Sequence, residues 1–318
     1  MIRILYTYPY KNDMKNLIFL ISFIMIGINS LGIDEKAEMK NLILKIRDES
    51  PKNFIIIPQN GTNIYFQKKG EVDKELLGAV DGITQESLFY GYPKYGEKTP
   101  YEGKKSLLKN LKILKSLDKV IMTVNYTNSN YGKWRSKNLA EDNSFLNYCP
   151  KDREVTEIVE DVFGKNTEDI TSLSHAKNFL YLLNPEKFRH RAKYIDVLSK
   201  TTYDVLIIDL YFKGIELTKD DLDKLRVKPQ GGRRLIIGYF SVGEAEEYRE
   251  YWKEEWDKKL PEWILYENKN WGGNYIVKYW SKEWRGIIEE MLIKYIDTGF
   301  DGVFLDTIDT YESFGKEE

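Results

Sequence analysis

Gly299–Asp309, with the sequence GFDGVFLDTID, has the pattern of a short buried strand that stops at an acidic residue. The run VFL at 303–305 is apolar and favours a strand, and Gly302 marks its beginning. Asp306 then falls at the C-terminal end of that strand, where α/β proteins bind ligands and carry catalytic groups. A buried Asp needs a partner or a function. Taken alone, the run is explained equally well by a catalytic acid and by a helix cap or a loop salt bridge.

Similar apolar runs recur along the chain and alternate with helical patterns. Eight strands separated by helices predict an α/β fold, namely a (β/α)8 TIM barrel in a single domain, with a doubly wound open sheet as the alternative. No G-x-G-x-x-G motif or P-loop follows any strand, so dinucleotide and phosphate binding have no support. The strands are expected near 54–57, 79–84, 120–124, 179–183, 204–208, 235–240, 263–266 and 303–305, and helices near 38–47, 104–117 and 283–297, with helical content near 152–162.

Composition argues against several function classes. With 48 basic and 50 acidic residues among 318, the net charge is −2, which gives no electrostatic case for nucleic acid. The single cysteine, Cys149, leaves no intrachain disulfide, and the two histidines, His175 and His190, are too few for most zinc or Ser–His chemistry. We therefore expect no metal and no cofactor. The 23 Tyr and 7 Trp residues are suited to stacking on sugar faces.

The N-terminus has the pattern of a targeting segment. Lys15 precedes an apolar run at 17–28, and Ser30 and Gly32 have the small-x-small spacing of a cleavage site. We interpret residues 1–32 as a signal peptide, which predicts a secreted or cell-surface protein. The alternative is membrane attachment through an uncleaved apolar segment, although the run is short for a full span.

Polar side chains gather where the predicted strands end, and in a barrel these ends meet on one face. Carboxylates, amides and aromatic groups on one face are typical of a sugar-cleaving site. Glycoside hydrolysis needs two carboxyl groups, one to protonate the leaving oxygen and one to attack the anomeric carbon or activate water. Structural hydrogen bonding is the alternative for most of them, Glu244 and Glu246 in particular. The residues are Asn60, Glu86, Asn125, Tyr126, Asp209, Ser241, Glu244, Glu246, Glu267 and Asp306.

Four longer motifs stand out: YDVLIID at 203–209, GYFSVGEAEEYR at 238–249, WGGNYIVKYW at 271–280, and the stretch 299–309. Together they resemble glycoside hydrolase family 114. That family, typified by endo-α-1,4-polygalactosaminidases, has a (β/α)8 fold and is mostly extracellular. The resemblance implies an exported glycosidase whose partner is a polysaccharide or oligosaccharide that contains amino sugars.

The order of the motifs departs from that family. IIPQNG at 56–61 and GITQESLFY at 82–90 come before the other motifs, whereas the family places the corresponding segments after them. The resemblance therefore implies a circular permutation, which barrels tolerate because their termini lie close together at the surface. In the body 33–318, we expect 37–126 to correspond to the family's C-terminal part, 127–175 to be the joining segment and 176–318 to correspond to the N-terminal part.

The resemblance also assigns roles. The family's acidic pair maps onto Asp306, as an ionised nucleophile helped by nearby donors, and Glu86, as a general acid/base with a raised pKa. Retention requires the two carboxyl groups about 5 Å apart, and inversion requires roughly 6.5–9.5 Å. An acidic cleft suits a cationic amino sugar. Substrate-binding roles are expected for Asp209, Asp309, Asn60, Tyr126, Glu244, Trp271 and Tyr275, with Trp280 as a further stacking candidate.

Two other functions stay open at this point. A non-catalytic carbohydrate-binding surface protein could use the same barrel and would bind glycan without turnover. Deacetylation of amino sugars is a different reaction on a related substrate, but it usually needs a His-rich metal site. The glycan, its linkage, and endo or exo action are not specified by the sequence.

Overall fold

The computed structural model describes residues 32–314 of the chain. Its contacts divide the chain into two units, Met1–Ile33 and Asp34–Glu318. The predicted signal peptide therefore lies almost entirely outside the described residues. Between residues 32 and 314, no helix combines the length and the apolar character that a membrane span requires.

Within residues 32–314, eight strands pair only in parallel, in two sheets. The order is β5-β6-β9-β13-β1 in one sheet and β2-β3-β4 in the other. All their carboxyl ends therefore point the same way within each sheet. The bounds are β1 (Ile55–Pro58), β2 (Gly82–Glu86), β3 (Val120–Val124), β4 (Leu146–Tyr148), β5 (Phe179–Leu182), β6 (Val205–Asp209), β9 (Leu235–Ser241) and β13 (Gly302–Asp306).

The two parallel sheets are neighbours at both edges but do not form one closed sheet. β1 meets β2 through a single parallel bridge between Gln59 and Thr84, and the Asn60 N–H donates to the Thr84 carbonyl at 2.7 Å. β4 lies against β5, yet the described residues form no ladder there. The structure is thus a mixed α/β fold with parallel sheets, and the closed (β/α)8 barrel that the sequence predicts is not shown.

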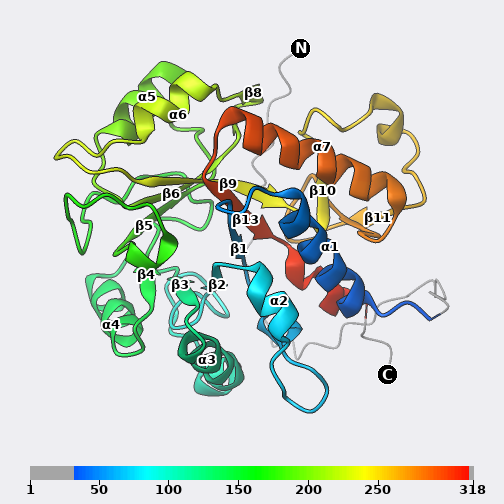
Figure 1. Ribbon diagram of the computed structural model, residues 1–318, viewed down its shortest axis with the longest axis horizontal. Helices are drawn as coiled ribbons and strands as arrows, with labels where there is room; N and C mark the ends of the chain where they lie inside the picture. The colour runs from blue at the N-terminus through cyan, green and yellow to red at the C-terminus, as the bar shows by residue number, and fades with distance from the viewer. Residues whose placement is uncertain (1–31, 315–318) are drawn as a thin grey trace, which may run out of the picture. The chain divides into compact units, whose positions relative to one another are not determined.

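Helices surround the strands, as Figure 1 shows. α7 follows from clear end signals, because the Ser281 hydroxyl accepts from the Trp284 N–H and Gly299 ends the helix with φ +96°. The helices are α1 (Glu35–Glu49), α2 (Lys74–Ala79), α3 (Tyr101–Ser116), α4 (Asn130–Glu141), α5 (Arg191–Ser199), α6 (Lys219–Leu225) and α7 (Lys282–Thr298), with 3-10 turns η1 (Thr62–Tyr65), η2 (Leu173–His175), η3 (Glu254–Asp257) and η4 (Ile308–Ser313).

One predicted strand has a different role from the one expected. The run at 263–266 corresponds to β11 (Ile264–Glu267), which pairs antiparallel with β12 (Asn274–Val277). β12 pairs antiparallel with β10 (Glu244–Glu246), so this small sheet stands apart from the parallel strands. A two-strand hairpin, β7 (Tyr211–Phe212) and β8 (Ile215–Glu216), is also separate.

The eighth parallel strand is instead β4, in the range 127–175 that was expected to be the joining segment. β4 has three residues, LNY, and they have neither the length nor the apolar content that identifies a strand in a sequence. The helical content expected near 152–162 is absent from the structure of that range.

Candidate active site

Asp306 is the last residue of β13, and its carboxylate is surrounded by donors. Tyr239, from β9, donates its hydroxyl to Oδ2 at 2.7 Å, and the Gln59 side-chain amide donates to Oδ1 at 3.0 Å. The Thr307 N–H also donates to Oδ1, at 2.8 Å. Three donors from three parts of the chain therefore hold this carboxyl group in one orientation.

The turn after Asp306 is strained. Thr307 has φ +62°, a left-handed conformation that is unfavourable for a β-branched residue. Its hydroxyl donates to the Asp306 carbonyl at 2.6 Å and accepts the Gly243 N–H at 2.8 Å. A side chain at Gly243 would meet the Thr307 carbonyl at 2.2 Å, so only glycine fits there. The close approach of these two loops keeps Thr307, and with it Asp306, in place.

Glu86 is the last residue of β2, and it has its own set of donors. Tyr126, which follows β3, donates its hydroxyl to Oε1, and the Asn60 amide donates to Oε2 at 3.4 Å. The Asn60 side chain also accepts the Glu86 N–H at 3.1 Å. Arg153 lies over the Tyr126 ring, with its guanidinium carbon 5.0 Å from the centroid. The residue after Glu86, Ser87, is again left-handed, with φ +51°.

The two carboxyl groups are connected through one dipeptide. β1 lies between β13 and β2, and Gln59 and Asn60 follow it directly. Gln59 hydrogen-bonds Asp306, while Asn60 hydrogen-bonds Glu86. The buried Tyr181 hydroxyl donates to Gln59 at 3.3 Å. Burial raises the pKa of Tyr181, and the negative charges of Glu86 and Asp306 raise it further.

Both carboxyl groups hold their protons more tightly than free Asp or Glu. Burial raises the pKa of Glu86, against the opposing effects of Tyr126, Arg153 and Asn60. The direction agrees with the prediction for a general acid. Burial, followed by the negative charge of Glu86, raises the pKa of Asp306 to about 8. This direction is opposite to the one expected for an ionised nucleophile, because burial outweighs the hydrogen-bond donors of Asp306.

Asp309 lies within electrostatic range of the pair, and Glu244 lies within range of Asp309. Burial raises the pKa of Asp309 to about 7, and the negative charges of Glu312 and Glu86 contribute. Burial also raises the pKa of Glu244, whose Oε1 accepts the Asn268 amide at 2.9 Å. Carboxyl groups that lie close together oppose one another's ionisation, which adds to the effect of burial on these pKa values.

Asp209 is held in an ion pair by Arg249. Arg249 donates to both oxygens, at 2.7 and 2.8 Å, and the Tyr211 N–H donates as well. The Arg249 Nε donates to Glu246 at 2.6 Å, and only 7% of Arg249 is exposed. Asp209, Arg249 and Glu246 thus form a buried ion triad. Both Asp209 oxygens thus have partners within the protein, and the substrate-binding role expected for Asp209 stays a prediction.

The aromatic residues expected to stack on sugar differ from one another. Trp271 is 40% exposed, so its ring is accessible. Tyr275 already stacks at 4.9 Å on Trp252, and its hydroxyl donates to Glu247 at 3.3 Å. Trp280 packs edge-on against two aromatic rings, Tyr279 and Phe314. Trp271 is the most open of the three for a ligand.

Gln59, Tyr181 and Tyr239 touch or face the acid pair, but the sequence did not single them out as site residues. Gln59 and Tyr239 stand in motifs already noted, while Tyr181 and Tyr239 lie inside strands rather than at their ends. A signal was nevertheless present, because polar side chains within otherwise apolar strands need hydrogen-bond partners.

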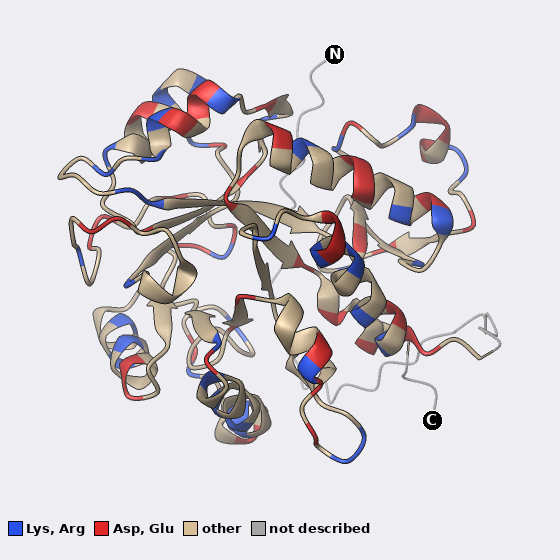
Figure 2. Ribbon diagram, viewed as in Figure 1, with Lys and Arg blue, Asp and Glu red and all other residues tan. Residues whose placement is uncertain are grey.

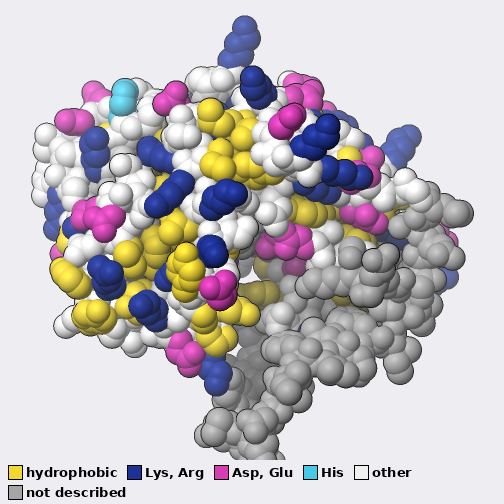
Figure 3. Space-filling view, turned by 90° about the horizontal axis from the view of Figure 1, so that it is seen from below, with side chains coloured by type: hydrophobic (Ala, Val, Ile, Leu, Met, Phe, Trp, Pro, Cys, Tyr) yellow, Lys and Arg dark blue, Asp and Glu magenta, His cyan; other side chains and the backbone are white. Residues whose placement is uncertain are grey.

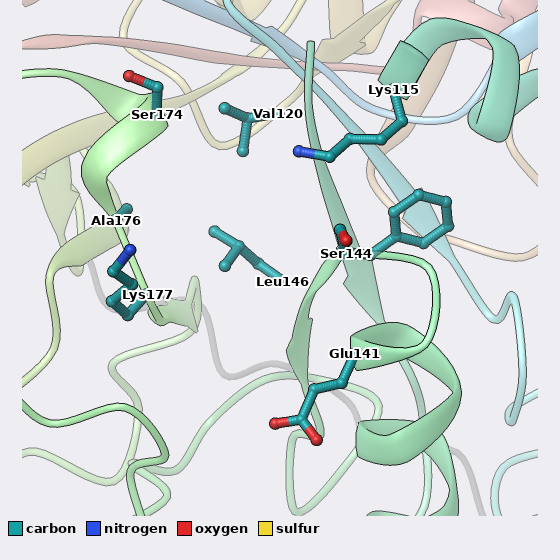
Figure 4. A pocket seen from close by; sticks show the side chains of 9 residues that line it. Lys115, Val120, Glu141, Ser144, Leu146, Ser174, Ala176 and Lys177 are labelled. Carbon is teal, nitrogen blue, oxygen red and sulfur yellow. The ribbon is translucent and has the colours of Figure 1, made fainter. Parts of the chain in front are cut away.

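A separate pocket of about 300 Å³ lies elsewhere, between α3, α4 and the starts of β3 and β4. Figure 4 shows Lys115 and Glu141 at its edges, with Val120 and Leu146 between them. These apolar residues begin their strands, so the pocket is at the opposite end from Glu86. Among the described residues, no cluster of His, Cys, Asp and Glu is arranged to hold a metal ion.

Curated relatives match only parts of this chain. An uncharacterized protein of Methanocaldococcus jannaschii is 37% identical over 152 residues, which are 48% of this chain and 43% of that protein. One of Thermotoga maritima is 37% identical over 120 residues, 38% of this chain and 37% of that protein. One of Deinococcus radiodurans is 43% identical over 89 residues, 28% of each. The chain thus spans less than half the length of these relatives.

A crystal structure of Aspergillus fumigatus Ega3 in complex with galactosamine has 23% identity to this chain and a TM-score of 0.29. The matched region covers 50% of this chain and 51% of the Ega3 chain. The model of glycoside-hydrolase family GH114 matches residues 165–317, which include β5, β6, β9 and β13 with Asp306. Residues 165–317, just under half of this chain, therefore match glycoside-hydrolase family GH114.

Proposed function

We propose that this chain is a glycoside hydrolase with Asp306 and Glu86 as its carboxyl pair. The observation that carries the proposal is the Gln59–Asn60 dipeptide, whose two side chains hydrogen-bond one carboxyl group each. Strands from the two halves of the chain thus contribute to one site, although the family match begins only at residue 165. This supports a barrel-like arrangement and a circularly permuted order, in which 37–126 supply the part that the family has at its C-terminal end.

The proposed mechanism is retaining. The Asp306 carboxylate attacks the anomeric carbon while the glycosidic C–O bond breaks, and the Glu86 proton goes to the leaving oxygen. Water then attacks the glycosyl ester, Glu86 takes the proton from that water, and Asp306 is released. The donors Gln59, Tyr239 and Thr307 stabilise the carboxylate whenever it is ionised.

The proposed substrate is an exported or surface polysaccharide that contains amino sugars. Asp306, Glu86, Asp309 and Glu244 give the site a surplus of acids, and three of them keep raised pKa values through burial together with the charge of a neighbouring acid. A substrate ammonium group would supply the missing positive charge and ionise Asp306 on binding. The remaining substrate contacts are proposed for Asn60, Tyr126, Asp309, Glu244 and Trp271.

The test is to incubate the protein with α-1,4-linked galactosamine oligomers and follow product size by mass spectrometry. Asp306→Asn and Glu86→Gln versions are run in parallel, with Glu255→Gln on η3 as a carboxylate control away from the acid pair. Cleavage by the parent and the control, lost in both site variants, supports a glycosidase with this pair. Tight binding without cleavage would instead favour the carbohydrate-binding alternative.

A further inference from the structure

One region of the chain is strongly basic although the whole protein is not. Residues 92–137 contain eleven Lys or Arg and three Asp or Glu, a net charge of +8, while the entire chain has −2. This region runs from the loop after β2 through α3 and β3 to the first two turns of α4. Figure 2 shows Lys and Arg recurring along α3 and α4 at the lower edge of the view. The net charge of the whole chain is therefore nearly neutral even though this region is basic.

Large aromatic side chains are exposed in the same region. Tyr92 is 57% exposed, Tyr101 61%, Tyr131 67% and Trp134 54%. The Tyr131 and Trp134 rings lie 5.9 Å apart on α4. On α3, a side chain at Gly103 would be 3.9 Å from the Tyr92 ring, so Tyr92 lies over the first turn of that helix. We call these four residues the aromatic surface.

Basic groups are interleaved with these rings. The Lys105 ammonium lies 5.8 Å from the centre of the Tyr101 ring. Burial lowers the pKa of Lys104, and the positive charges of Lys98 and Arg135 lower it further. Arg135 belongs to α4 and Lys104 to α3, so the two helices present one continuous basic field. Figure 3, taken from the side on which α3 and α4 lie in Figure 1, shows hydrophobic side chains interspersed with Lys and Arg.

The aromatic surface lies at the same end of the strands as the acid pair. Tyr101 and Tyr131 occupy the first turns of α3 and α4, which follow the C-terminal ends of β2 and β3. Tyr90 connects the two sites, because it follows Glu86 by four residues and interacts electrostatically with Tyr131 and Arg135 of α4. Burial raises the pKa of Tyr90, which is also affected by Tyr131 and Arg135. A polymer lying on the aromatic surface would therefore pass close to the loop that follows Glu86.

We propose that the aromatic surface, with Lys98, Lys104, Lys105 and Arg135, binds an anionic polysaccharide, a sugar chain that carries carboxylate or sulfate groups. Rings stack on the apolar faces of sugars, and Lys and Arg neutralise the acidic groups along the chain. This goes beyond the proposed function, because a cationic amino sugar would be attracted to the acid pair and repelled by this surface. The protein would be held on an anionic matrix while its acid pair acts on another glycan.

A sugar chain fits better than a nucleic acid. Glu97 and Glu102 are exposed within the same region, and their carboxylates can accept hydrogen bonds from the many hydroxyl groups of a sugar chain. The location beside a proposed glycosidase site favours the same choice. That part of the argument rests on the proposed function, but binding can be measured without any turnover.

The experiment measures the affinity of the full chain for polygalacturonate, with neutral dextran and oligothymidylate for comparison. One variant is Tyr131→Ala with Trp134→Ala, and another is Lys98→Gln with Lys105→Gln. The matched control is Lys219→Gln with Lys224→Gln, which removes two exposed charges from α6 instead. Circular dichroism and the cleavage assay on galactosamine oligomers are recorded for every variant.

We expect polygalacturonate binding that weakens about tenfold in both surface variants and stays within about twofold of the parent in the control. It should weaken with added salt, because the charges involved are exposed. Equal binding by surface variants and parent would overturn the proposal. Tighter binding to oligothymidylate would also overturn it and assign the surface to nucleic acid. If the parent binds polygalacturonate but does not cleave galactosamine oligomers, the proposed glycosidase is contradicted while the proposal for this surface stands.

Discussion

Tyr239 donates a 2.7 Å hydrogen bond to Oδ2 of Asp306, although 67 positions separate the two residues in the chain. The hydrogen bond opposes the effects of burial and of Glu86 on the pKa of Asp306. Tyr239 is therefore a positioning residue that also favours the ionised form of the proposed nucleophile.

Tyr239→Phe should lower kcat/KM and move the acidic limb of the pH–rate profile to higher pH. The loss of a hydrogen bond to a charged group corresponds to about 1.5–3 kcal/mol, or roughly 10- to 100-fold in rate. Tyr65→Phe is the matched control, because the buried Tyr65 hydroxyl has no hydrogen-bond partner in the described structure. An unshifted pH profile in Tyr239→Phe would contradict the role given to this hydroxyl.

Asp306→Asn should stabilise the protein at pH 8 more than at pH 4. Since folding raises the pKa of Asp306 to about 8, the folded protein binds more protons than the unfolded chain between about pH 4 and 8. The contribution of Asp306 to the free energy of unfolding is therefore largest below about pH 4, and it is lost as the pH rises toward about 8. Urea unfolding at both pH values should give a gain of roughly 1–3 kcal/mol at pH 8 and little at pH 4. An equal effect at both would mean that Asp306 ionises normally.

Gly243→Ala should destabilise the protein and reduce cleavage, because the new methyl group would lie 2.2 Å from the Thr307 carbonyl and 2.4 Å from the Thr310 hydroxyl. Overpacking of this kind costs about 1–3 kcal/mol. Gly286→Ala in α7 is the control, since no atom lies within 4 Å of the added group, and it should stabilise by about 0.5–1 kcal/mol. Thermal unfolding and cleavage rates distinguish the two. Normal activity in Gly243→Ala would show that the strained turn at Thr307 does not position Asp306.

Arg249→Gln should be among the most destabilising substitutions in the chain. It would leave the carboxylates of Asp209 and Glu246 without their cation in a buried site, which typically costs about 3–5 kcal/mol. Arg249→Lys keeps the charge but loses the bidentate geometry, so it should fall between the parent and Arg249→Gln. Chemical denaturation measures both. A loss below about 1 kcal/mol in Arg249→Gln would mean that water reaches the triad.

A rearranged chain should fold and retain its activity. Its order would be 161–317, a flexible linker, then 33–160, which leaves the family match at 165–317 uninterrupted. The new join is short, because α1 lies against η4 and the Tyr279 hydroxyl donates to the Glu35 carbonyl at 2.8 Å. The new break falls between two exposed residues, Glu160 and Asp161. Cooperative unfolding and cleavage like those of the parent are expected. A chain that stays unfolded would remove the physical basis for a permuted order.

The strands that the sequence predicted well are those whose pattern is complete within a few residues. β6 and β13 are continuous apolar runs that end at an acid, and both occur close to their expected positions. β4 was missed because three residues with mixed burial carry no local signal. β11 was taken for a parallel strand, since an apolar run does not reveal its pairing partner.

The sequence by itself determined the alternation of strands and helices, the acids at the strand ends and the likeness to family GH114, because each depends on residues close together in the chain. Only the tertiary structure decided how the acids are paired. Asp209 is neutralised by Arg249 from 40 residues away, whereas Asp306 and Glu86 meet the two neighbouring side chains Gln59 and Asn60. Burial and charge at a carboxyl group are set by what surrounds it in space, so identical Asp residues at identical strand ends acquire different chemistry.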